Sequence, residues 1–195
     1  MGEIRNMTKA ELKQQERDQH EPAFLKWLEG QPAALERFLT EVAPDVGALP
    51  EPYSREGLRL AVVAARATFD NSESAFAPEN AEVAGLFVRH FGEVYIRSFE
   101  GHWVNIPDNA SRPVEFLPLV STPSGGICID PEGQFAKSWV KQTSKSAPVH
   151  PDGLPVWVFD NWHRNYEKWV TAGRPDREEW DRIVRADLLK RASEL

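Results

Sequence analysis

Residues 87–105 have the sequence FVRHFGEVYIRSFEGHWVN, within which the spacing of the apolar residues changes. The first apolar residues recur at the three- and four-residue spacing of a helix, and Gly92 is the residue type that most often ends one. The residues that follow are rich in β-branched and aromatic types, which is typical of strands, and a Glu-Gly pair offers a two-residue turn. The stretch therefore predicts a helix that ends at Gly92 and a β-hairpin formed by residues 93–99 and 102–106.

Two further strands are expected at residues 114–121 and 126–129, joined by a loop that contains proline and glycine. With the hairpin they would form a short antiparallel β-meander of about four strands. Helical spacing and capping residues predict helices over residues 9–20, 22–29, 33–42, 54–69, 80–91, 131–142, 159–169 and 176–188. N-terminal helices, a short meander and C-terminal helices together indicate an α+β fold rather than an alternating α/β fold.

A chain of 195 residues usually forms a single domain, and we expect one domain here, in three parts. The proline-containing loop at 44–52 would separate a helical N-terminal part, residues 1–50, from an α+β core at residues 53–142. A second linker at 143–155 would precede a C-terminal helical segment at residues 154–195.

Composition excludes several classes of function. The chain has 23 basic and 30 acidic residues and a net charge of −7, which argues against binding of nucleic acid through its phosphates. No apolar run approaches the roughly 20 residues of a membrane helix. The single cysteine, Cys128, rules out an internal disulfide and a zinc site made of thiolates. Because the first 20 residues are polar and charged, we expect a cytoplasmic protein without a secretion signal.

The sequence contains no clear catalytic constellation. Cys128 lies between two isoleucines in an expected core strand, so a packing role is favoured over a nucleophilic one. Asp160, His163 and Glu167 recur at helical spacing and could offer metal ligands, but a solvated helix face explains them more simply. Glycine motifs that cradle phosphates and the serine nucleophile elbow are absent. We therefore expect no catalytic residue, no metal and no cofactor.

Residues 76–142 carry a resemblance to a known group of proteins. Its fixed points are two glycines, two charged residues and a tryptophan: Gly92, Glu93, Arg97, Gly101 and Trp103. The segment resembles small bacterial proteins of unknown function, some of which are similar to the immunity proteins of toxin systems. The resemblance implies a protein that acts by binding another protein, and it carries over no catalytic residue.

The chain is also rich in large aromatic residues, with seven tryptophans, ten phenylalanines and three tyrosines. A partly exposed tryptophan is a common anchor of protein interfaces. The segment after the second linker supplies the candidate interface residues, which are Trp157, Trp162, Tyr166 and Trp169. These aromatics, the acidic charge and the lack of catalytic motifs favour a non-enzymatic module that binds another protein, which could be a basic one, as an inhibitor or immunity-type protein does.

Two alternatives from other classes stay open. A small-molecule enzyme or ligand-binding protein would have its site on the hairpin face that carries Glu93, Tyr95, Arg97 and His102. A structural subunit of an oligomeric assembly, or a homodimer, would associate through the C-terminal helices.

Overall fold

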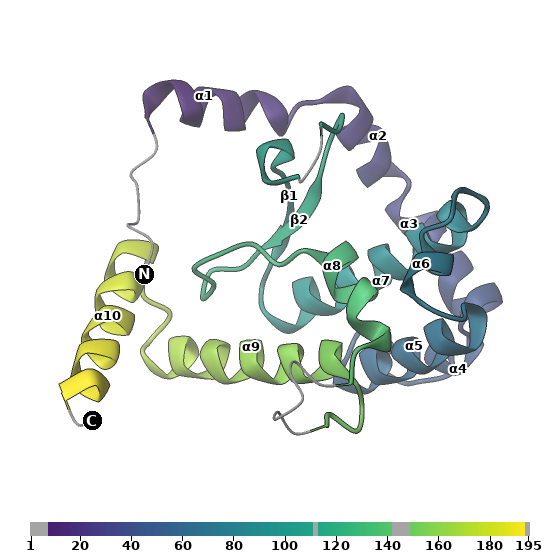
Figure 1. The fold of residues 1–195 in the computed structure, drawn as a ribbon. Helices are drawn as coiled ribbons and strands as arrows, with labels where there is room; N and C mark the ends of the chain where they lie inside the picture. Colours follow the sequence, from purple (N-terminus) through teal and green to yellow (C-terminus); the bar gives the residue numbers. More distant parts are fainter. Residues whose placement is uncertain (1–7, 111–112, 142–148, 194–195) are drawn as a thin grey trace.

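The computed structural model describes residues 8–110, 113–141 and 149–193, and helices dominate these residues (Figure 1). The α-helices are α1 (Lys9–Asp18), α2 (Pro22–Glu29), α3 (Gln31–Arg37), α4 (Pro44–Gly47), α5 (Arg55–Thr68), α6 (Ser72–Ala75), α7 (Ala81–Ser98), α8 (Pro131–Ala136), α9 (Leu154–Thr171) and α10 (Arg177–Ser193). Short π or 3-10 segments are η1 (Phe38–Val42), η2 (Pro78–Asn80), η3 (Pro107–Asn109) and η4 (Lys137–Trp139). The two strands are β1 (His102–Asn105) and β2 (Pro118–Ser121). No described helix has both the length and the apolar character that a membrane crossing needs.

Helix α7 forms the centre of the core. It packs against α3, α5, α8 and both strands, and it is buried over most of its circumference, as a central helix must be. Phenylalanines from four segments meet on it, and the rings of Phe87 and Phe135 stack with centroids 5.2 Å apart. Phe38 and Phe69 contact Phe87 edge-on. Much of the aromatic content of the chain is therefore used for packing.

The predicted end of this helix at Gly92 is wrong, and so is the first strand of the hairpin. The helix continues to Ser98, and the chain turns at Glu100, whose φ is +54°. Gly92 is required inside the helix because the ring of Trp103 lies on its Cα, where an added Cβ would be 1.8 Å from Cη2 of that ring. Residues 93–99 resemble a strand because this part of the helix is buried on more than one face, and Val94 is fully buried.

The sheet is smaller than the predicted four-stranded meander. Among the described residues it contains only β1 and β2, which pair antiparallel with Trp103 opposite Val120. The expected strand at 126–129 contributes one isolated bridge, between Val120 and Ile129. The chain before this bridge packs against α9 instead of extending the sheet, since a Cβ at Gly125 would be 2.4 Å from the ring of Trp162. The structure thus combines many helices with a small antiparallel sheet.

Candidate functional site

The four residues expected on one hairpin face do not share a surface. Glu93 and Arg97 lie one turn apart on α7 and form an ion pair of 3.2 Å. Tyr95 lies on the opposite side of the helix, is fully buried, and donates a 3.5 Å hydrogen bond from its hydroxyl to the carbonyl of Pro155. His102 is exposed on β1. The hairpin-face site is therefore not assembled, because a helix separates side chains that a strand would align.

The four candidate interface residues of α9 have different surroundings. Trp169 is 5% exposed, and its Nε1 donates to the carbonyl of Pro175 at 2.9 Å. Trp162 and Tyr166 are partly buried against the core, and the Tyr166 hydroxyl donates to Glu100 at 2.7 Å. Trp157 is 42% exposed. Of the four, only Trp157 is classed as exposed, and a role for the set in partner binding stays a prediction.

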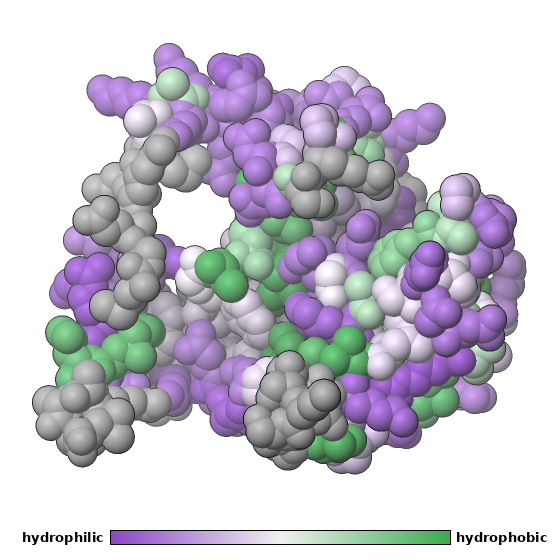
Figure 2. Space-filling model, viewed as in Figure 1, coloured by the Kyte–Doolittle hydropathy of each residue, from purple (hydrophilic) through white to green (hydrophobic). Residues whose placement is uncertain are grey.

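Trp157 lies in a small apolar surface that we call the Trp157 surface, consisting of Val140, Val149, His150 and Trp157. Val149 is 57% and Val140 is 37% exposed, and the rings of His150 and Trp157 are 5.0 Å apart. Backbone hydrogen bonds connect these segments, since Leu154 N donates to Val140 O at 3.2 Å. Figure 2 shows hydrophobic side chains, in green, that reach the surface around the start of α9. The surface combines an aromatic centre with exposed valines.

The start of α9 fixes the position of Trp157. Gly153 precedes the helix with φ +93°, a conformation that favours glycine, and Pro155 lies in the first turn, where its missing N–H costs no hydrogen bond. A Cβ at Gly153 would also lie 2.7 Å from Nη2 of Arg66. These local constraints set the direction in which α9 leaves the linker and place Trp157 on its outer side.

The opposite side of α9 borders a cleft of about 580 Å³, which we call the α9 cleft. Three segments form it: the loop 50–55, the end of α7 and the first half of α9. Phe159 and Tyr53 contribute aromatic surface, and Arg97 and His163 contribute polar groups. Of the earlier hairpin-face candidates, only Arg97 lines this cleft.

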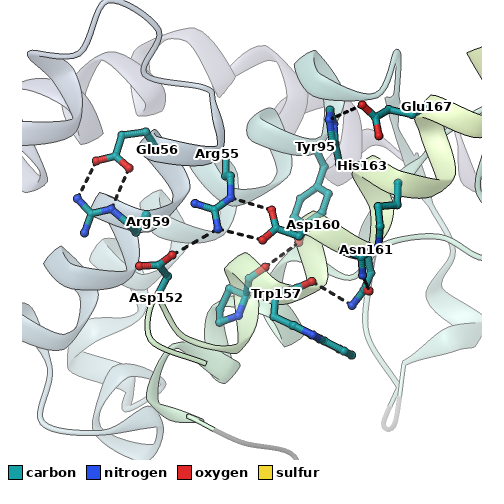
Figure 3. A network of polar contacts seen from close by, with 12 residues as sticks. Arg55, Glu56, Arg59, Tyr95, Asp152, Trp157, Asp160, Asn161, His163 and Glu167 are labelled. Atoms are coloured by element: carbon teal, nitrogen blue, oxygen red, sulfur yellow. Dashed lines mark hydrogen bonds and ion pairs between the residues drawn. The ribbon is translucent and has the colours of Figure 1, made fainter. Parts of the chain in front are cut away.

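One wall of the α9 cleft is an ion-pair network between α5 and α9 (Figure 3). Arg55 contacts both carboxylate oxygens of Asp160, through Nε at 2.7 Å and Nη2 at 2.9 Å, and it also contacts Asp152 at 3.3 Å. The hydrogen bonds that Arg55 donates to Asp160, and less strongly the one to Asp152, raise the pKa of Arg55 above its usual value. Both oxygens of Asp160 are therefore already occupied.

The helical trio considered as metal ligands is divided between two partners. Asp160 is bound by Arg55, and Nε2 of His163 lies 3.3 Å from Glu167 (Figure 3). Within the described ranges, no group of three His, Cys, Asp or Glu side chains is arranged to hold a metal ion. Cys128 is half-buried, and burial raises the pKa of its thiol, which disfavours the thiolate that a nucleophile needs.

Sequence reasoning did not identify one strongly perturbed titratable group near this cleft, which is His90 on α7. Its ring is fully buried and stacks on Phe38 with centroids 4.4 Å apart. Nε2 donates to the carbonyl of Pro52 at 3.0 Å, and Nδ1 has no hydrogen-bond partner among the described residues. Burial lowers the pKa of His90 to about 4. The helical apolar face at Phe87 and Phe91 was the only sequence signal for this burial.

Comparisons of this chain with protein-family models, with curated proteins and with solved structures give no match. The Trp157 surface and the α9 cleft, on two sides of α9, are therefore the features of the structure that bear on function.

Proposed function

We propose that the chain is a non-enzymatic module that binds another protein, as an inhibitor or immunity-type protein does, and that the partner docks on the Trp157 surface. The observation that carries the proposal is the 42% exposure of Trp157 beside two exposed valines. Trp169 and Trp180 of the same C-terminal part are only 5% and 3% exposed, so the chain can bury a tryptophan there. A large aromatic side chain left in water next to other apolar groups is typical of an interface anchor.

The charge of the chain supports a basic partner. A net charge of −7 attracts a basic protein over distances of about one Debye length and raises the rate of encounter. Apolar contact at Trp157 would then hold the complex. We therefore expect association to slow as salt concentration rises, with little effect of salt on dissociation.

Replacing the anchor should weaken the complex without affecting the fold. We expect Trp157→Ala to lower affinity for the partner by about 30-fold, the effect of removing an interface hot spot of about 2 kcal/mol. The partner is recovered from a lysate of the source organism on the immobilised wild-type chain, identified, purified and titrated by calorimetry. The matched control is Leu12→Ala, which removes an apolar side chain that is 52% exposed on α1. Equal affinities of wild type and Trp157→Ala would contradict the proposal.

A second candidate function, a subunit of a homo-oligomer, is favoured by one observation on α10. Trp180 anchors the first turn of α10, since its Nε1 donates to the carbonyl of Ser124 at 2.9 Å. Beyond it Ile183, Leu188 and Leu189 are 39%, 60% and 66% exposed, and Figure 2 shows a green patch over this helix. Figure 1 shows α10 turning away from α9. The apolar residues of α10 could therefore pack on the same helix of a second copy.

Light scattering tests this second candidate. We expect a mass of twice 22.1 kDa for the wild-type chain and 22.1 kDa for Leu188→Asp, because a buried charge would break the helix–helix contact. Val63→Asp, at a residue 51% exposed on α5, is the control and should leave the mass unchanged. A wild-type mass of 22.1 kDa at all concentrations would exclude the homo-oligomer.

A further inference from the structure

Arg97 is held in place but is only partly used. Its Cζ lies 3.6 Å from the centroid of the Tyr53 ring, so the guanidinium is stacked against an aromatic surface. Its Nε donates to Glu93 at 3.2 Å, and neither Nη atom has a hydrogen-bond partner within the described part of the chain. The side chain is 53% exposed and lines the α9 cleft. The two Nη groups form the end of a planar fork that matches a carboxylate.

The other charges of the cleft do not compete for this role. Arg55 is already paired with Asp160 and Asp152 through its Nε and Nη2, and in turn it occupies both oxygens of Asp160. Glu51 is the remaining carboxylate of the lining, and it lies exposed at the rim. Arg97 is therefore the one lining cation, among the described residues, that is oriented by stacking and keeps free donors.

The rest of the cleft is suited to an apolar body. Phe159 is 5% exposed and forms a rigid aromatic wall, and Pro50 and Pro52 add apolar surface on the loop side. The volume of about 580 Å³ is within the range of about 300–1,000 Å³ that is usual for sites of small organic ligands. A site with apolar walls and one oriented cation selects a molecule with an apolar part and one negative group.

We infer that the α9 cleft binds a small organic acid with an aryl or acyl body, whose carboxylate is bound by the Nη groups of Arg97. The body of the acid packs between Tyr53 and Phe159. This site is separate from the proposed protein interface, since Trp157 does not line the cleft. Failure of either proposal leaves the other intact.

Binding of four acids tests the inference: benzoate, phenylacetate, 3-phenylpropionate and octanoate, each paired with its neutral amide. We expect at least one acid to bind saturably, with Kd of about 1 mM or tighter, and its amide to bind at least about tenfold more weakly. Titration calorimetry and ligand-observed NMR on the full chain give both values. No saturation by any acid at about 10 mM, or equal binding of acid and amide, would overturn the inference.

Two variants locate the site. Arg97→Gln should weaken acid binding by at least about tenfold, because it removes the charged fork. Arg59→Gln is the matched control, since Arg59 pairs with Glu56 on α5 and does not line the cleft. Ser98→Trp fills the cleft without removing a charge and should abolish binding even if Arg97→Gln fails to fold. Acid binding that survives either cleft variant in a folded chain would overturn the inference.

Discussion

Gly92→Ala will destabilise the chain by about 3 kcal/mol, whereas Gly85→Ala, seven residues earlier in the same helix, will stabilise it by about 0.5–1 kcal/mol. The added Cβ at position 92 meets Cη2 of Trp103 at 1.8 Å and Cζ2 at 2.2 Å. Trp103 cannot easily move, because its Nε1 donates to Glu93 at 3.2 Å and its ring packs edge-on against Trp27 with ring centroids 4.8 Å apart. A Cβ at Gly85 meets nothing within 4 Å, so only the helix propensity of alanine acts there.

Urea unfolding of both single variants gives these free energies. A double variant, Gly92→Ala with Trp103→Ala, identifies the cause, since the alanine at 92 should cost less than about 1 kcal/mol once the ring is gone. If the chain instead formed a hairpin after Gly92, the alanine would be strained at a helix end, and removing Trp103 would not relieve it. A cost at position 92 that is independent of Trp103 would therefore contradict the continuous helix α7.

Lowering the pH from 6.5 to 4 will reduce the free energy of unfolding by about 3 kcal/mol because of His90. The pKa of His90 is lowered from the usual 6.5 to about 4 by burial, with a smaller opposing effect of the hydrogen bond to Pro52 and a small contribution from Arg97. The unfolded chain thus takes up a proton in this range before the folded chain does. The stabilisation is fully present above pH 6.5 and is lost as the pH falls toward 4.

The free energy of unfolding, measured from pH 7.5 to pH 5, tests this prediction before most carboxylates titrate. We expect the wild-type chain to lose about 2 kcal/mol from pH 6.5 to pH 5, and His90→Met to lose much less. His102→Gln, at an exposed histidine of β1, is the control and should follow the wild-type curve. Parallel curves for wild type and His90→Met would show that His90 is not the titrating group.

Local signals in the sequence were sufficient to place several helix starts. Thr8 and Glu11 form the predicted capping box before α1, and Ser54 caps α5 by accepting from the backbone N–H of Gly57. Each of these motifs joins residues only three positions apart, so the sequence alone identifies both partners of the hydrogen bond. Residues 93–99 were misassigned because a helix buried on several faces loses the polar stripe that marks its period.

The site residues were harder to predict, since the two sides of α9 depend on distant contacts. Trp169 falls on the helix predicted over residues 159–169, whereas Trp157 precedes it, and the exposures of 5% and 42% depend on what packs nearby. The α9 cleft draws Tyr53, Arg97 and Phe159 from three segments that are far apart in the chain. Of these, sequence reasoning selected only Arg97 as a ligand-binding candidate, and for a hairpin that does not form.

Hydrogen exchange of the chain with and without its purified partner tests the proposed docking surface most directly. We predict slower exchange in peptides that cover residues 149–161, which contain Trp157, and no change in α1 or in the last turns of α10. Equal exchange at residues 149–161 in the free and bound chain, with slowing on α10 or α1 instead, would contradict the claim that the Trp157 surface binds the partner.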